Sequence, residues 1–136
     1  MLVSEQLRKF IQDSGETRAR IARESRIDYK VLKRFLEDKK SILLRTADKL
    51  AEYLDLEFVL RIGIEEEKRI DASTLSEQLH GFLMDCQATH YRISEDADVQ
   101  RLVIGRFLRG KHSLQLKTVD RLAEYLDLTL KKKRNH

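Results

Sequence analysis

The feature that most constrains this chain of 136 residues is an internal repeat with an offset of 72 residues. The tetrapeptide SEQL at residues 4–7 recurs at 76–79, and the heptapeptide at 50–56 recurs unchanged at 122–128. Without a gap, this offset matches about 25 of the 57 positions from residue 4 to residue 60. Two copies are too few for a solenoid, so we predict two small domains, 1–62 and 76–136, joined by a linker at 63–75.

Composition favours helices in both copies. The chain contains no proline and only 5 glycines, and it lacks the Asn-Gly and Asp-Gly pairs that mark tight hairpins. We therefore expect an all-α fold. The single cysteine, Cys86, cannot form an intramolecular disulfide, and no apolar stretch approaches the roughly 20 residues that span a bilayer. These features predict a cytoplasmic protein without membrane segments.

Each copy shows the periodicity of four short helices. In the first copy, Leu7, Phe10 and Ile11 share one face of a helix at about 4–14, and Thr17 is a candidate N-cap for a second helix. Asp28 is a candidate N-cap for a third helix, and a fourth carries an apolar stripe between residues 44 and 54. Helices this short are unstable alone in water, so a shared core must hold them.

The two copies end differently. Residues 57–62 place apolar side chains at alternate positions, which predicts a short edge strand or an extended arm. Through this segment, two chains could pair as a homodimer. The second copy has the basic run 131–134 instead, for which we expect a solvated tail.

Positive charge is concentrated in the segment that contains the second and third helices of the first copy. The whole chain has a net charge of +4, whereas residues 17–40 alone contain nine Lys and Arg against four Asp and Glu. Two helices joined by a tight turn, the second bearing exposed Tyr29, Lys30 and Lys33, suit the major groove of DNA, which is about 12 Å wide and admits one helix.

Cations also occur where helix energetics disfavour them. Arg18 and Arg20 fall in the first turn of the second helix and Arg45 in that of the fourth, where the helix dipole penalises a positive charge by about 0.3–1 kcal/mol. A phosphate at these helix ends would reverse the penalty. The alternative is that they are ordinary exposed arginines.

The residues of the first copy resemble the lambda-repressor-like (Cro/Xre) helix-turn-helix family. The resemblance lies in the segments RIAR at 20–23, IDYKVLKRFL at 27–36, Lys39 and TADKLA at 46–51, and the second copy repeats it. It implies two tandem helix-turn-helix domains of four or five helices that bind operator DNA. It further implies base contacts from Tyr29, Lys30 and Lys33, and phosphate contacts from Arg18, Arg20, Lys39 and Arg45.

The same resemblance implies DNA contacts in the second copy. Bases would be read by Arg101, Leu102 and Gly105, and phosphates would be bound by His90, Arg92, Lys111 and Lys117. Two features depart from the first copy or from the family. The turn where the family often has glycine carries Arg26 and Asp98, and residues 89–112 hold only five Lys and Arg against three acidic residues. Because of this lower positive charge, we expect the second copy to bind DNA more weakly than the first. The alternative to DNA binding by the second copy is a role in pairing or in binding a protein partner.

The sequence offers no enzyme active site. We find no glycine-rich phosphate loop, nucleophile elbow or paired acids, and we expect no cofactor. Cys86 and His90 lie four residues apart, but we expect a buried thiol and a surface imidazole there instead of a zinc site.

The sequence thus predicts a cytoplasmic, nucleoid-associated transcriptional regulator that binds double-stranded DNA. Its linker could extend to roughly 40 Å and place the two copies on half-sites about 34 Å apart. The alternative is a protein-interaction adaptor or antitoxin-like module on the same scaffold. RNA is a weaker third candidate, since the major groove of duplex RNA is too narrow for a helix.

Overall fold

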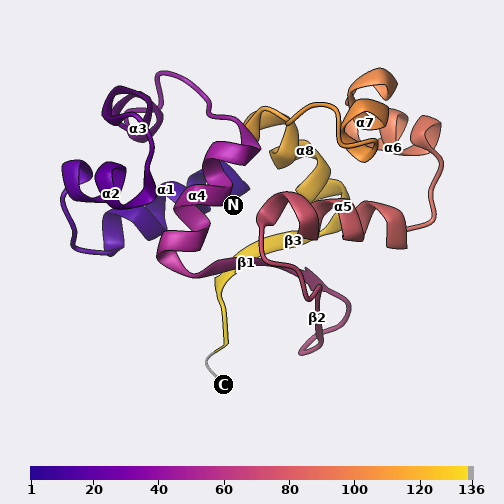
Figure 1. Cartoon of the computed structure of the whole chain (residues 1–136). Helices are drawn as coiled ribbons and strands as arrows, with labels where there is room; N and C mark the ends of the chain where they lie inside the picture. The colour runs from indigo at the N-terminus through magenta and orange to yellow at the C-terminus, as the bar shows by residue number, and fades with distance from the viewer. Residues whose placement is uncertain (135–136) are drawn as a thin grey trace.

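A computed structural model describes residues 1–134 as eight helices and three strands. The first repeat forms α1 (Val3–Asp13), α2 (Arg18–Ser25), α3 (Tyr29–Leu36), α4 (Leu44–Leu54) and strand β1 (Leu56–Arg61). After β2 (Glu67–Arg69), the second repeat forms α5 (Leu75–Asp85), α6 (His90–Ala97), α7 (Arg101–Leu108), α8 (Leu116–Leu126) and β3 (Leu128–Lys132). Figure 1 shows α2 and α3 at one end of the molecule, α6 and α7 at the other, and the sheet below.

The expectation of an all-α fold of two tandem domains is wrong, because the two repeats share a three-stranded antiparallel sheet in the order β2-β1-β3. Strand β1 occupies the segment with alternating apolar residues. Strand β3 includes Lys131 and Lys132, where we expected a solvated tail, and β2 lies within the expected linker. Leu128 and Leu130 alternate with polar residues and are buried, which is the pattern of a strand with one face on a core.

The register of the sheet relates the two repeats by an approximate two-fold axis. Phe58 pairs with Leu130, its own equivalent 72 residues later, and the flanking pairs are arranged symmetrically around this point. A second antiparallel bridge joins Leu43 to Gln115, again equivalent positions. The interface between the halves therefore has the self-complementary geometry of a symmetric dimer, built within one chain.

Each half contributes its last strand to the other half. The backbone N–H of Leu130 in β3 donates to Oε1 of Gln6 in α1 at 2.8 Å, and that of Phe58 in β1 donates to Oε1 of Gln78 in α5, also at 2.8 Å. Buried side chains of both repeats form one continuous core. This packing fixes the halves against each other, so an extended linker between independent domains does not describe the molecule.

The exchange also occupies the edges of β1. Since β1 is the central strand, with β2 on one side and β3 on the other, it has no free edge for a second chain. The expected pairing of two chains through residues 57–62 is therefore replaced by pairing within the chain.

The helices of the described part are short. The longest have 11 residues, and across residues 1–134 none has both the length and the apolar character required to cross a membrane.

Candidate nucleic-acid interface

Local hydrogen bonds define the ends of α2 and α3. Thr17 caps α2 by accepting from the N–H of Arg20 at 3.1 Å, and Asp28 caps α3 by accepting from the N–H of Lys30 at 2.7 Å. Between the helices, Arg26 adopts a left-handed conformation with φ of 61°. The family that the sequence resembles often has glycine in this turn, and an arginine there costs conformational energy.

One face of α3 is buried and the opposite face is exposed. Leu32 and Phe35 are completely buried in the core, which leaves Tyr29, Lys30 and Lys33 exposed, Tyr29 at 46%. Within residues 1–134, no carboxylate oxygen lies within 4.0 Å of the side-chain nitrogen of Lys30 or of Lys33. These three side chains are thus available to a ligand that approaches α3 from solvent.

A basic residue that sequence reasoning missed holds the C-terminal end of α3. Arg8 in α1 donates from Nε to the carbonyl of Phe35 at 2.8 Å, and its guanidinium lies 4.5 Å from the centre of the Phe35 ring. In the second half the equivalent residue, His80, contacts the carbonyl of Leu108 at 3.0 Å. The sequence gives no sign of these contacts, because Arg8 and His80 look like ordinary polar residues on the outer face of an amphipathic helix.

Three of the four cations expected to bind phosphate in the first half already have a carboxylate nearby. Arg18 and Lys39 lie 3.6 Å and 3.7 Å from the carboxylate of Glu37. Arg20 pairs with Glu16 at 3.1 Å, and Glu16 also accepts a hydrogen bond of 2.5 Å from the Tyr53 hydroxyl. The Tyr53 hydroxyl and the Glu16 carboxylate raise the pKa of Arg20 above its ordinary value. All three cations are exposed, so an incoming phosphate would compete with these carboxylates.

The fourth cation, Arg45, lies beside the two-fold axis with its equivalent Lys117. The backbone N–H of Arg45 donates to Oγ of Ser113 at 3.1 Å, and that of Lys117 donates to Oγ of Ser41 at 3.3 Å, so each half caps a helix of the other. A groove of about 520 Å³ lies here, between the halves. Its lining includes the basic residues Arg34, Lys40 and Lys117. Sequence reasoning placed Arg45 and Lys117 in separate domains, whereas the structure brings them to one surface.

The second half repeats the geometry of the first but not its side chains. Thr89 caps α6, Asp98 occupies the turn with φ of 57°, and α7 exposes Arg101 and Leu102. Gly105 is buried and, together with His90, Arg101, Leu102 and Arg109, lines a hollow of about 410 Å³. Of the four residues expected to bind phosphate there, Arg92 pairs with Asp96 at 2.8 Å, which raises the pKa of Arg92. The other three, His90, Lys111 and Lys117, are exposed.

The reading helices share one side of the molecule. In Figure 1, α3 and α7 lie at opposite ends and both lie away from the sheet, with the N-termini of α4 and α8 between them. These helices and helix ends, which carry exposed cations, therefore lie on the surface of the molecule away from the sheet. We call this surface the reading face.

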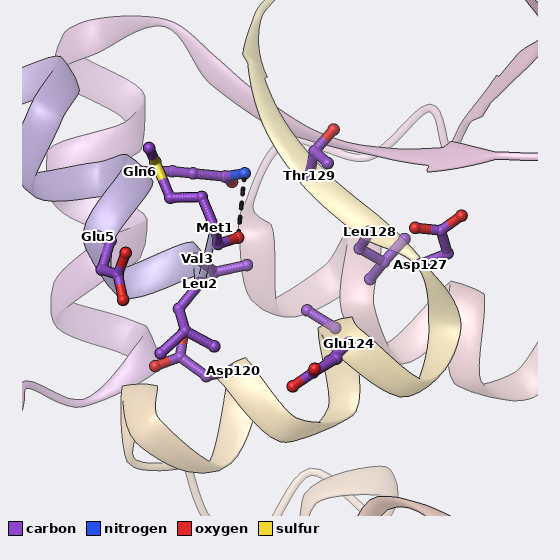
Figure 2. Close-up of a pocket in the computed structure, with 11 residues that line it drawn as sticks. Met1, Leu2, Val3, Glu5, Gln6, Asp120, Glu124, Asp127, Leu128 and Thr129 are labelled. Carbon is purple, nitrogen blue, oxygen red and sulfur yellow. Dashed lines mark hydrogen bonds between the residues drawn. The ribbon is translucent and has the colours of Figure 1, made fainter.

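A second hollow has the opposite electrostatic character. It measures about 330 Å³ and lies between α1, α8 and β3. Figure 2 shows the acidic side chains around it, from Glu5, Asp120, Glu124 and Asp127. Lined by carboxylates, this hollow repels phosphate, so a nucleic acid has no electrostatic reason to bind there.

The described residues hold no group of three or more His, Cys, Asp and Glu side chains arranged to bind a metal ion. Cys86 is exposed at the end of α5, so the expectation of a buried thiol is wrong. The last buried residue of α5 is Leu83, and Cys86 follows the end of the helix.

Comparison with protein-family models, with curated proteins and with solved structures yields no match to this chain.

Proposed function

We propose that this protein binds double-stranded DNA in a sequence-dependent manner and acts as a cytoplasmic transcriptional regulator. In this proposal α3 and α7 enter the major groove as the second helices of two helix-turn-helix motifs, consistent with the resemblance to the Cro/Xre family. One observation carries it most strongly: the capped helix α3 exposes Tyr29, Lys30 and Lys33 beside the cations of the reading face.

Each set of residues has a distinct role in this proposal. Tyr29, Lys30 and Lys33 contact base edges, where lysine favours the O6 and N7 acceptors of guanine. Arg45 and Lys117 bind phosphates near the two-fold axis, and Arg18, Arg20 and Lys39 bind phosphates near α3. For Arg18, Arg20 and Lys39, a new contact with phosphate offsets the loss of the present contact with a carboxylate.

The first test is selection of bound sequences from a random pool of duplex DNA, followed by affinity measurements on the selected site. We expect Lys30→Ala/Lys33→Ala to remove the preference for the selected bases in the half-site under α3. Lys9→Ala/Lys68→Ala is the matched control, because it removes the same charge from α1 and β2 and should retain the preference. A double variant of Lys30 and Lys33 with unchanged preference contradicts the assignment of α3.

A protein-binding role is the second candidate, and one observation favours it. The second half exposes the apolar side chains of Tyr91 and Leu102, at 59% and 56%, and both lie near Arg101. A protein partner could cover them. Salt separates the two candidates, because binding to phosphates weakens steeply as salt rises whereas an apolar protein interface responds little.

A further inference from the structure

The two reading helices have a fixed spatial relationship. Strand exchange, the Leu43–Gln115 bridge and the shared core hold α3 and α7 in place relative to the two-fold axis. A ligand that contacts both helices therefore meets them at one spacing and in one relative orientation. In a symmetric homodimer the two helices would also be identical, and the preferred DNA site would be an inverted repeat.

Here the two helices differ where they face solvent and agree where they pack. The buried Phe35 has an identical equivalent, Phe107, and Leu32 is replaced by the similar Ile104. By contrast, each of the three residues expected to contact bases is replaced by one of different chemistry: Tyr29 by Arg101, Lys30 by Leu102 and Lys33 by Gly105. The scaffold is thus duplicated, while the exposed chemistry is not.

The surface of α7 suits a different base pattern from that of α3. The guanidinium of Arg101 lies 5.8 Å from the centre of the Tyr91 ring, and Arg101 is exposed, so a bidentate contact with a guanine is the base contact that suits it. Leu102 is 56% exposed beside it, and a leucine at a base edge favours the methyl group of thymine. Where Lys33 projects from α3, α7 has the hollow above Gly105.

We propose that the chain recognises an asymmetric DNA site in a single orientation, with unlike half-sites under α3 and α7. The half-site under α3 is read by two lysines and a tyrosine. The half-site under α7 is read by Arg101 and by the apolar surface of Leu102. This inference rests on the proposed DNA-binding function and specifies which kind of DNA site the protein takes.

The test converts the second reading helix into a copy of the first. The variant Arg101→Tyr/Leu102→Lys/Gly105→Lys fits the fold, because the atoms nearest to a Cβ at Gly105 belong to the flexible Arg109 side chain, at 3.7 Å, an ordinary contact. The wild type should select a site with two different half-sites. The triple variant should select an inverted repeat of the half-site under α3 and bind that repeat about tenfold or more tightly than the wild type does. Met84→Lys, which adds the same net charge at an exposed position of α5, is the control and should keep the wild-type site.

Orientation is measured on the wild-type fold through Cys86, the only cysteine and an exposed one. An iron chelate attached to Cys86 cleaves DNA near the second half of the protein. We expect cleavage at one end of the selected site only.

The outcomes separate the inference from the function on which it rests. If the wild type enriches no DNA sequence, the proposed function fails. If it enriches an inverted repeat, a site with defined bases under one helix only, or a site that the chelate cleaves equally at both ends, the protein binds DNA but the asymmetric recognition is overturned. Should the triple variant fail to fold, the wild-type selection and the cleavage pattern still decide the question.

Discussion

The hydroxyl of Ser76, in the second half, donates a hydrogen bond of 2.5 Å to Oδ2 of Asp48 in the first half, and the backbone N–H of Ser76 donates to Oδ1 at 2.9 Å. Ser4 makes the same two contacts with Asp120, at 2.6 Å and 2.8 Å. A pair of equivalent residues therefore connects α4 to α5 and α8 to α1. These polar contacts fix the register of the helices against which the strands pack.

Ionisation of Asp48 makes the free energy of unfolding depend on pH in the acidic range. Burial raises the pKa of Asp48 above its ordinary value of 3.8, although the hydrogen bonds from Ser76 act in the opposite direction. The Asp48 carboxyl binds its proton more tightly in the folded state than in the unfolded state. The protonated carboxyl therefore adds to the free energy of unfolding fully below the ordinary pKa, and this stabilisation is lost as pH rises through the raised pKa. We expect Asp48→Asn to remove this loss, as measured by urea unfolding at a series of acidic pH values. An unchanged pH profile for Asp48→Asn would contradict the assignment.

Phe58 lies at the centre of the β1–β3 pairing and is completely buried. Truncation to alanine removes packing on the two-fold axis, so Phe58→Ala should lower the free energy of unfolding by about 3–5 kcal/mol. We also expect a single unfolding transition for the wild type, because the core is shared by both halves. Chemical denaturation followed by circular dichroism measures both quantities. Ile64→Ala is the control, since Ile64 is 99% exposed, and two separate wild-type transitions would show that the halves fold independently.

Arg26 holds a left-handed conformation that costs an L-residue about 1 kcal/mol. Glycine adopts this conformation without a Cβ penalty, so Arg26→Gly should raise the free energy of unfolding by up to about 1 kcal/mol. Thermal denaturation is a sufficient measurement. The converse variant, Gly15→Ala, places a Cβ at φ of 74° and should destabilise the protein. A loss of stability in Arg26→Gly would mean that the Arg26 side chain has a structural role of its own.

Arg45 and Lys117 give a prediction for the proposed DNA contact near the axis. Arg45→Ala and Lys117→Ala should each reduce the slope of log affinity against log salt by about 1, without changing the preferred sequence, because a phosphate contact carries no base information. Affinity titrations at several salt concentrations test this. Lys9→Ala should retain the wild-type slope. If Arg45→Ala alters the preferred bases, this residue reads bases and has been assigned to the wrong class of contact.

Local chemistry in the sequence predicted the helices well. The caps at Thr17 and Asp28 are present with the expected hydrogen bonds, and the repeat offset relates each helix of the first half to one in the second. Leu43 and Gln115, which lack a capping side chain, belong instead to the bridge between the halves. Short-range signals of this kind are contained within a few residues, so sequence alone can reveal them.

The sheet could not be predicted in the same way, because its pairing joins residues far apart in the chain. Lys131 and Lys132 look like a solvated tail until the pairing with β1 is known, where Lys131 contacts Glu67 and Lys132 lies opposite Leu56. The groove beside Arg45 and Lys117 depends on the same long-range contact. The individual cations of the candidate site were therefore identifiable, but their common surface was not.

Pairing of the two halves within one polypeptide has a consequence for assembly. A dimer of separate subunits dissociates on dilution, whereas here both partners are tethered and meet at an effective concentration that does not depend on how many molecules are present. The paired form of the two halves should therefore persist at nanomolar protein.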